Sequence, residues 1–385
     1  MNFNKIDKAL LSLALSLEEG KKWECIVRSY DYQRTKNSMI HKNIKILNEY
    51  LFINSFRVLA DRHQLEQLSN MSQVKFVSSV SKASTLMHVA KKIMGVEEQN
   101  LSGSGVTIAF IDTGIEKHCD FCLGGNRIIE FKDFVNEREN CYDDNGHGTF
   151  VAGVCSGNGA LSCGRNSGIA PKANIVSLKA LNKHGEASAD KILDAMEWVY
   201  NNHHQYDIKV VCMSFGSEPL GFNDPIMLGA EALWRAGVIV VAAAGNSGPE
   251  FQTIKSPGVS NQIITVGGFN DNRLEEEEVN ENFFEIAEFS SRGPAFQRFK
   301  PDLVAPSVDI LSCGLKNSYC KLSGTSVATP MIAGLCALLI EQNPKITPME
   351  IKRILLSSCK PITFNRNLEG FGYPNLNNIK NRNRF

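Results

Sequence analysis

Short apolar runs rich in β-branched residues alternate with segments of helical periodicity over most of the chain. After residue 105 the strand-like runs are VTIAFID, NIVSLKAL, IKVVCMSF, GVIVVAAAG and QIITVGG, and helical segments between them include SADKILDAMEWVYNN and DPIMLGAEALWRAG. Nearly continuous apolar strands separated by helices predict an α/β fold: a doubly wound, mainly parallel sheet with helices on both faces. In such folds functional groups gather at the carboxyl ends of the strands.

The first part of the chain has a different pattern. We expect strands at residues 23–30, 55–60 and 74–80 and a helix at 61–71, where Asp61 and Gln64 occupy the positions of a capping box. This pattern predicts a small α+β module. We place the boundary near residue 84, which divides the chain into a module of residues 1–84 and a main domain of residues 85–385.

The N-terminal run ALLSLALSL could be taken for the core of a secretion signal. However, Asp7 interrupts the basic segment that precedes the run, the run ends in EEGKK, and no small-x-small cleavage site follows. We therefore expect an amphipathic helix within residues 1–20 that stays on the protein. No other segment approaches the roughly 20 apolar residues that cross a bilayer.

Composition narrows the class of partner. The 385 residues are 43% hydrophobic and 21% charged, with 41 basic and 41 acidic side chains, so no net charge attracts nucleic acid or an anionic membrane. We expect polypeptides or neutral small molecules as partners. The acidic run at residues 275–278 is expected to be a solvated loop, and the last eight residues a basic tail.

The 11 cysteines are odd in number and scattered, which favours free thiols in a reducing compartment and predicts a cytoplasmic protein. Cys119 and Cys122 form one C-x-x-C, but no second pair follows. A structural role for these two thiols is therefore favoured over zinc or redox chemistry.

Four polar residues stand at the edges of the predicted sheet and helices. Asp112 ends a strand, His147 lies between two glycines at the start of a helix, Asn246 follows a buried strand, and Ser326 lies in the first turn of the apolar helix MIAGLCALLI. Each alone could be a turn former or a helix cap. Together, in the order Asp, His, Ser, with an amide donor between His and Ser, they predict a nucleophilic site.

The segments IDTGI, NGHGT, AAGNSGP, SSRGP and SGTSVATP resemble, in this order, the signature segments of subtilisin-like serine proteases. The likeness extends from residue 106 to about residue 375. It is closest to the intracellular, AprX-like branch found in Bacillus and clostridial bacteria. Residues 23–80 resemble, more weakly, the ferredoxin-like inhibitory propeptide of that family.

The resemblance implies a serine endopeptidase that works through an acyl-enzyme. Ser326 would attack the scissile carbonyl after His147 takes its proton, and Asp112 would orient the imidazole. The amide of Asn246 and the backbone N–H of Ser326 would bind the oxyanion. The family's substrate-binding edge matches Ser214, Phe215 and Gly216, where an extended peptide would pair as an added strand.

The resemblance also points to residues that would set specificity. Lys255 matches a position at the floor of the pocket for the side chain before the scissile bond. There it would favour an acidic or short polar side chain of the substrate, unless its flexible stem carries the ammonium out to water. No Asp or Glu occurs between residues 74 and 95, where self-cleavage is expected, which argues against a strict acidic preference. Glu186 is a candidate for a more distant pocket.

Departures from the family pattern also carry expectations. Phe150 replaces a frequent second histidine and Val327 a common methionine, and neither change removes a catalytic group. The loop SGNGALSCGRNSGIAP does not resemble the family's strong calcium loop, so we expect no metal and no cofactor. The N-terminal module is expected to act as an intramolecular inhibitor that also assists folding.

Two other functions would fit parts of this pattern. A catalytically silent, subtilisin-shaped regulatory protein of the spore-germination type would be expected to lack part of the Asp, His, Asn and Ser set, yet all four residues are present. An α/β-hydrolase esterase would carry its serine in G-x-S-x-G and in another chain order. The sequence therefore favours an active peptidase.

Overall fold

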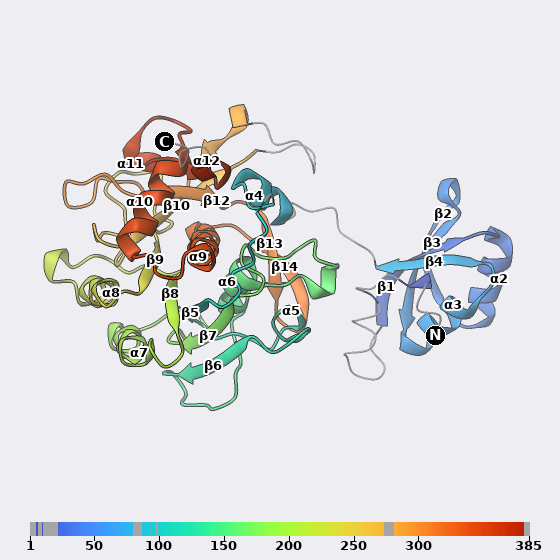
Figure 1. Ribbon diagram of the computed structural model, residues 1–385. Helices are drawn as coiled ribbons and strands as arrows, with labels where there is room; N and C mark the ends of the chain where they lie inside the picture. Colours follow the sequence, from blue (N-terminus) through green and yellow to red (C-terminus); the bar gives the residue numbers. More distant parts are fainter. Residues whose placement is uncertain are drawn as a thin grey trace. The chain divides into compact units, whose positions relative to one another are not determined.

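The structure is a computed structural model that describes residues 5–6, 10, 22–79, 87–97, 99–272 and 281–380 (Figure 1). The chain divides into two compact units, one of residues 1–84 with 160–164 and one of residues 85–159 with 165–385. The expected helix within residues 1–20 falls almost entirely outside the described residues. So do the segment around residue 84, the acidic run at 275–278 and the end of the basic tail.

The first unit contains a four-stranded antiparallel sheet in the order β2-β3-β1-β4. Its elements are β1 (Lys22–Ser29), α2 (Tyr32–His41), β2 (Lys45–Tyr50), η2 (Leu51–Ile53), β3 (Ser55–Asp61), α3 (Arg62–Asn70) and β4 (Val74–Ser79). The capping box is confirmed, since Gln64 N donates to Asp61 Oδ1 at 2.9 Å and Asp61 N donates to Gln64 Oε1 at 3.1 Å. Strand β2 and helix α2 were not predicted.

The second unit is built on an eight-stranded sheet. Strands β11-β10-β9-β8-β5-β7-β6 lie side by side and β12 also pairs with β10, all in parallel except β11. The strands are β5 (Thr107–Asp112), β6 (Ile128–Asp133), β7 (Asn174–Lys179), β8 (Ile208–Met213), β9 (Ile239–Ala243), β10 (Ile264–Asn270), β11 (Glu285–Ile286) and β12 (Leu303–Pro306). The predicted α/β class with a mainly parallel sheet is confirmed.

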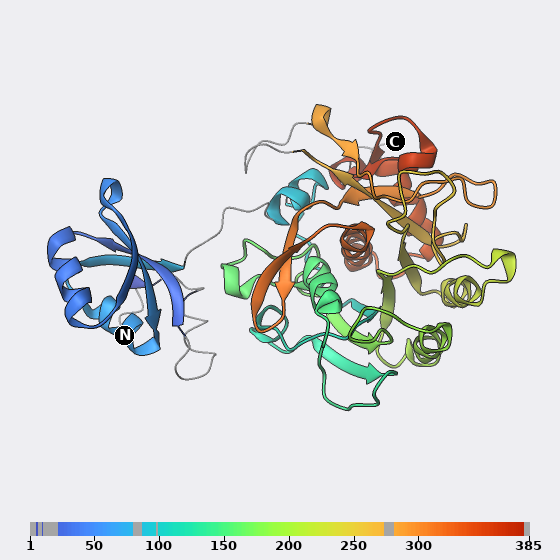
Figure 2. The same cartoon turned by 180° about the vertical axis from the view of Figure 1, so that it is seen from behind.

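Helices cover both faces of this sheet (Figures 1 and 2). On one face α6 (His147–Ser156) packs against α9 (Thr325–Gln342), and on the other α7 (Ala189–Asn202) packs against α8 (Pro225–Arg235). The elements not yet named are α4 (Met87–Ile93), α5 (Cys119–Cys122), η3 (Ala160–Ser162), η4 (Gly221–Asn223), η5 (Glu281–Phe283), β13 (Ile310–Gly314), β14 (Ser318–Leu322), α10 (Pro348–Ser358), β15 (Cys359–Lys360), α11 (Arg366–Glu369), β16 (Tyr373–Pro374) and α12 (Asn377–Lys380).

Strand β5 occupies the point at which the strand order reverses, because β7 lies on one side of it and β8 on the other. Carboxyl ends of parallel strands meet at one edge of a sheet, and ligands bind where the order reverses. Asp112 is the last residue of β5. Residues 214–216 follow β8, and Asn246 follows β9. The topology therefore gathers these candidates at one edge.

Helix α9 is the core of this arrangement. By length and composition it is, among the described helices, the one that could span a membrane, but 83% of the helix is buried inside the protein. Such burial is typical of the central helix of a globular domain. The helix is a rigid support for the residues in its first turn.

Candidate active site

Asp112 and His147 form the first pair of the site. His147 Nδ1 donates to Asp112 Oδ1 over 2.8 Å, and the backbone N–H of Thr113 donates to the same oxygen over 2.7 Å. Asp112 is 1% exposed, whereas 25% of the His147 side chain remains exposed. The carboxylate is thus buried behind the imidazole, and the ring keeps a face toward solvent.

The pair depends on a glycine beside the histidine. A Cβ on Gly148 would lie 2.1 Å from the backbone oxygen of Gly114 and 3.2 Å from Asp112 Oδ1. Gly146, with φ 103°, caps the helix that begins at His147. These two glycines let the start of α6 approach the end of β5, as the sequence suggested from their positions.

Asp143 organises the loop that carries the histidine. Its Oδ1 accepts from Thr113 Oγ1 at 2.9 Å, Asn145 N at 3.0 Å and Gly146 N at 2.8 Å. Its Oδ2 accepts from Thr149 N at 2.9 Å and Thr149 Oγ1 at 2.7 Å. Sequence reasoning did not single out this aspartate, although a carboxylate three residues before a helix-capping glycine is a recognisable signal.

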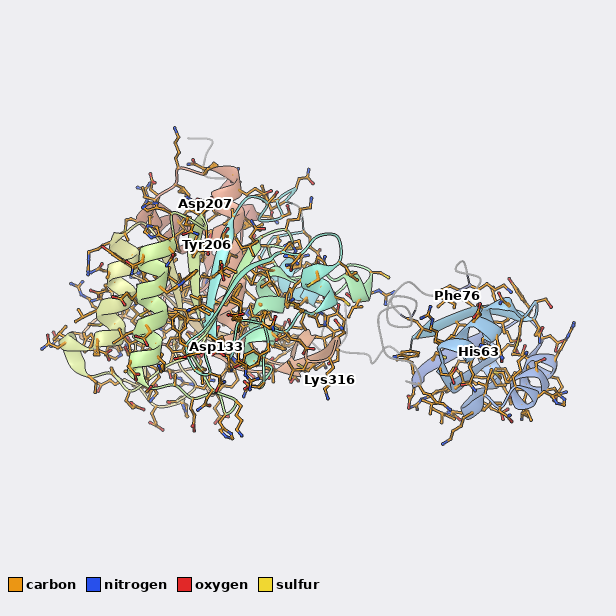
Figure 3. All side chains as sticks on the ribbon, turned by 90° about the horizontal axis from the view of Figure 1, so that it is seen from below. His63, Phe76, Asp133, Tyr206, Asp207 and Lys316 are labelled. Atoms are coloured by element: carbon orange, nitrogen blue, oxygen red, sulfur yellow. The ribbon has the colours of Figure 1, made fainter. Side chains whose placement is uncertain are left out.

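A second aspartate fixes the segment that leads into this loop. Asp133 ends β6 (Figure 3) and accepts from the backbone N–H groups of Val135, Asn136 and Arg138 and from Tyr142 Oη at 2.7 Å. Four residues between Asp133 and Asp143 therefore donate to one buried carboxylate. Hydrogen bonds to these two carboxylates therefore hold much of the loop before His147.

The electrostatic setting favours protonation of the imidazole. Burial lowers the pKa of His147, but the charge of Asp112, the hydrogen bond to it and the charge of Asp143 outweigh burial, so that the pKa is raised above its ordinary value. A histidine with this pairing accepts a proton more readily than a free imidazole. That is the property of a general base next to a buried carboxylate.

Ser326 and Asn246 form the second pair. A Cβ on Gly324 would lie 3.1 Å from Ser326 Oγ and 3.2 Å from Asn246 Nδ2. Both polar atoms therefore face the small open space beside Gly324, which a side chain at that position would fill. The hydroxyl and the amide donor come together from the start of α9 and the loop after β9.

Thr325 fixes the orientation of the Asn246 amide. The backbone N and the Oγ1 of Thr325 both donate to Asn246 Oδ1 at 2.9 Å, and Gly245 N donates to Thr325 Oγ1 at 3.2 Å. With its oxygen held in this way, the amide directs Nδ2 toward the space beside Gly324. The hydroxyls at the start of α9 do not cap the helix, since the residue at the cap is Gly324 and no side chain bonds there.

The two pairs are carried by helices in contact. His147 begins α6, Ser326 lies in the first turn of α9, and α6 packs against α9. Phe150 and Val327, the two departures from the family pattern, are fully buried in the core. They fill space between the elements and expose no polar group.

The stretch after β8 offers free main-chain groups. Ser214 is buried, and among the described residues the backbone N–H and C=O of Phe215 and Gly216 have no hydrogen-bonding partner. Ser217 and Ser256 then form a two-residue antiparallel bridge. An extended peptide could pair with the open groups in the manner of an added strand.

Lys255 lies against this stretch. A Cβ on Gly216 would lie 2.6 Å from Lys255 Cβ, and one on Gly245 would lie 2.5 Å from Lys255 Cγ. The ammonium forms an ion pair with Glu218, whose side chain is 79% exposed. Glu218 was not anticipated from the sequence. Glu186 lies in an exposed turn where its backbone oxygen accepts from Asn182 N, and the structure brings it to none of the other candidates.

One group of buried side chains has the composition of a metal site. Among the described residues, His118, Asp120 and Cys313 bring ligand-type atoms within 4.8 Å of one another. Their atoms already bond within the protein: His118 Nε2 to Ser318 O at 3.0 Å, and Asp120 Oδ2 to Tyr319 Oη at 2.7 Å. These side chains are thus hydrogen-bonded to neighbouring groups of the protein. All 11 cysteines are free thiols.

Comparisons with known proteins agree with one another. A model described as the Subtilase family matches residues 103–374. Serine protease AprX of Bacillus subtilis is 41% identical over 315 residues, which is 75% of this chain and 70% of that protein. Subtilisin Savinase of Lederbergia lenta is 32% identical over 72% of this chain and 91% of its own.

Solved structures give the same match. The chain is similar to Sphericase with a TM-score of 0.64 and 27% identity, covering 74% of this chain and 97% of that one. It is similar to the S41 psychrophilic protease with a TM-score of 0.64 and 29% identity, covering 77% and 100%. The family model's match to residues 103–374 contains all four polar residues of the two pairs described above.

Proposed function

The chain belongs to the subtilase family and is a subtilisin-like serine endopeptidase, and we propose that it cleaves polypeptides through an acyl-enzyme on Ser326. The observation that carries the proposal is the juxtaposition of Ser326 Oγ and Asn246 Nδ2 around Gly324. A nucleophile beside a fixed amide donor, at the start of a buried helix, is suited to acyl transfer.

In the proposed mechanism His147 Nε2 takes the proton of the Ser326 hydroxyl as Oγ attacks the scissile carbonyl. Asp112 holds the imidazole in the tautomer that leaves Nε2 free to accept, and its charge stabilises the imidazolium. His147 then gives the proton to the leaving amine. A water molecule attacks the acyl-enzyme by the same route in reverse.

The developing oxyanion would lie beside Gly324, where the Asn246 amide and the backbone N–H of Ser326 are its donors. The N-terminus of α9 adds the positive end of the helix dipole. Because Thr325 fixes the amide oxygen of Asn246, the donor is set before the substrate arrives. Little reorganisation is then needed in the transition state.

We propose that residues 214–216 bind the substrate as a strand and that Lys255 and Glu218 line the pocket for the side chain before the scissile bond. Pairing through main-chain groups tolerates many sequences. The ion pair between the two side chains offsets the charge of the lysine, which supports a pocket without a strict acidic preference.

We further propose that the N-terminal module, residues 1–84, inhibits the peptidase until it is cleaved, and that the mature enzyme works in the cytoplasm without a cofactor. The antiparallel sheet with two helices supports the module's role. Free thiols at all cysteines support the location. Unchanged activity after dialysis against EDTA is the expected result for the absence of a metal.

The proposal is tested by incubating an unstructured protein with the enzyme and identifying the fragments by mass spectrometry. Wild type and Ser357→Ala should produce the same fragments, because Ser357 is an exposed serine of α10 whose hydroxyl donates to the Ile354 carbonyl of the same helix. Ser326→Ala should produce none and should keep its N-terminal module, whereas wild type should release a fragment ending near residue 84. Cleavage by Ser326→Ala at the wild-type rate would refute the assignment.

A further inference from the structure

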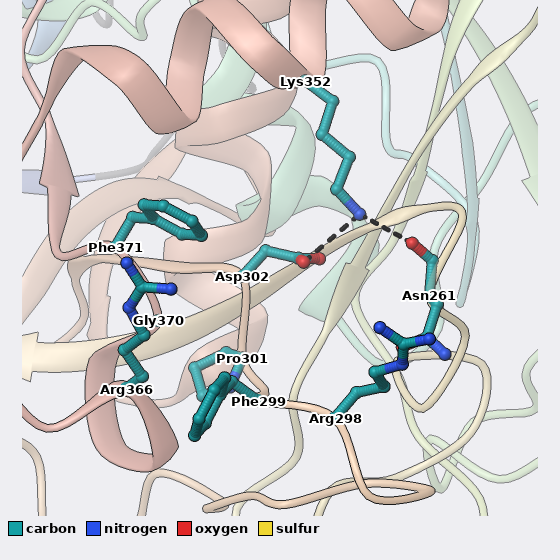
Figure 4. Close-up of a pocket in the computed structure, with 9 residues that line it drawn as sticks. All are labelled: Asn261, Arg298, Phe299, Pro301, Asp302, Lys352, Arg366, Gly370 and Phe371. Carbon is teal, nitrogen blue, oxygen red and sulfur yellow. Dashed lines mark hydrogen bonds and ion pairs between the residues drawn. The ribbon is translucent and has the colours of Figure 1, made fainter.

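A hollow of about 420 Å³ opens on the second unit between the loop after residue 297, helix α10 and the segment from α11 to residue 371 (Figure 4). None of the residues assigned to catalysis or substrate binding lines it. Its walls combine cationic and aromatic side chains with a single carboxylate: Arg298, Phe299, Asp302, Lys352, Arg366 and Phe371.

The carboxylate of Asp302 is already neutralised. Lys300 Nζ lies 2.7 Å from its Oδ2, Lys352 Nζ lies 3.2 Å from its Oδ1, and Thr265 N donates to Oδ2 at 2.8 Å. Lys352 is occupied as well, because its ammonium donates to the carbonyl oxygens of residues 261–263, one of which Figure 4 shows at Asn261. Asp302 is therefore no counter-ion for the arginines of the rim.

The two arginines have no such partner. Within the described part of the chain, neither the Arg298 nor the Arg366 guanidinium forms an ion pair or a side-chain hydrogen bond. The nearby Glu369 is buried, and its carboxylate accepts from the backbone of Ile362 and Thr363. In a chain with a net charge of 0, this hollow holds two uncompensated cations.

Aromatic rings hold one guanidinium in place. The Arg366 guanidinium carbon lies 4.5 Å from the Phe371 ring centre and 6.0 Å from that of Phe299. Stacking orders the plane of the guanidinium and leaves its edge N–H groups free to meet an oxyanion in bidentate fashion. Phe299 is 60% exposed and Phe371 42% exposed, so ring surface also remains open to a ligand.

We propose that this hollow binds a small molecule with an oxyanion, phosphate or carboxylate, attached to a flat aromatic group. The oxyanion takes the edge donors of Arg366, and Arg298, which lies on the opposite side of the hollow in Figure 4, adds a second positive charge that attracts the anion. The aromatic group of the ligand stacks on the ring of Phe299 or Phe371. The site is separate from the peptidase chemistry and does not depend on it.

Calorimetric titration at low ionic strength tests the site with phenyl phosphate, inorganic phosphate and phenol as probes of full-length Ser326→Ala protein. Phenyl phosphate should bind saturably at one site and more tightly than inorganic phosphate, and phenol should not bind. In that background Arg366→Gln and Arg298→Gln should each weaken phenyl phosphate on the order of tenfold. Benzoate, an aromatic carboxylate, serves as a further probe and reports whether a carboxylate can replace the phosphate.

Arg353→Gln is the matched control, since Arg353 is an exposed arginine on the same helix as Lys352 that does not line this hollow. It should bind phenyl phosphate as the parent protein does. Arg366→Lys keeps the charge without the fork and should also bind more weakly. Absence of saturable binding, equal binding of the two phosphates, or unchanged affinity in the Arg298→Gln/Arg366→Gln double variant would overturn the proposal.

Discussion

The Nδ1 of His147 donates to the Oδ1 of Asp112 over 2.8 Å, and this carboxylate is almost completely buried. The bond assigns the proton of the neutral ring to Nδ1. Nε2 is then the atom free to accept a proton from a nucleophile. This hydrogen bond determines which ring nitrogen of His147 can act as the base. It also affects the pKa of the ring, and therefore the pH range in which His147 can accept a proton.

The pH dependence of activity should report the raised pKa of His147. Below this pKa the ring is protonated and cannot act as a base, so kcat/KM falls as the pH decreases through it. We expect the acid limb of kcat/KM to lie above the ordinary histidine value of about 6.5. Rates on a soluble peptide measure it, and an acid limb below that value would contradict the arrangement.

Asp112→Asn should lower kcat by about 10⁴-fold, because the amide no longer favours the active tautomer or the imidazolium. The acid limb of kcat/KM for the remaining activity should also move to lower pH, since the charge that raises the pKa of His147 is gone. Asp207→Asn is the control, because Asp207 is an exposed residue paired with Lys209. Equal losses in both variants would point to general charge effects.

Asn246→Ala should leave a slow enzyme. Removal of one oxyanion donor costs about 10²-fold to 10³-fold in kcat and little in KM. Thr325→Val keeps the backbone N–H but removes the hydroxyl that holds Asn246 Oδ1, so we expect a smaller loss of about tenfold. Steady-state kinetics on one peptide separate the two parameters. A rise in KM alone would assign Asn246 to substrate binding.

Asp143→Asn should disturb the loop that presents His147. The amide cannot accept all five of the hydrogen bonds that the carboxylate accepts, and we expect a loss of about 2 kcal/mol in the free energy of unfolding. The acid limb of kcat/KM should also move down, because the charge of Asp143 contributes to the raised pKa of His147. Glu139→Gln, at an exposed position, should change neither.

Glu218→Gln should alter the pocket preference. Without its carboxylate partner the ammonium of Lys255 is free to meet an acidic side chain. We compare kcat/KM for a peptide with Glu before the scissile bond with kcat/KM for the same peptide with Leu there. This Glu-to-Leu ratio should rise severalfold in Glu218→Gln, and adding Lys255→Ala to that variant should abolish the rise. An unchanged ratio in Glu218→Gln would place the ammonium outside the pocket.

The sheet of the second unit was predictable because its strands are buried on both faces and appear as continuous apolar runs. β6 is partly exposed and β14 is mostly exposed, and their mixed sequences IIEFKD and SYCKL give no such run. Helix α2 buries only Thr35 and Met39, so its hydrophobic face is too weak to recognise. These elements are formed by tertiary contacts rather than by local pattern.

The site was predictable to the extent that glycines and strand ends mark it. Asp112, His147, Asn246 and Ser326 all lie next to positions where backbone geometry is special. Asp143 and Glu218 were missed because their partners, Thr149 and Lys255, become neighbours through the fold of the loops. Hydrogen-bond networks of this kind leave no periodic signal in the sequence.

Labelling with a serine-directed sulfonyl fluoride, followed by mass measurement of the intact protein and of its peptides, tests the central claim most directly. The account predicts one sulfonyl group per processed molecule, on Ser326, with loss of activity in proportion to labelling. Ser326→Ala should take up none and His147→Ala far less, because the hydroxyl is then not activated. A label on another residue, or full labelling without loss of activity, would contradict the account.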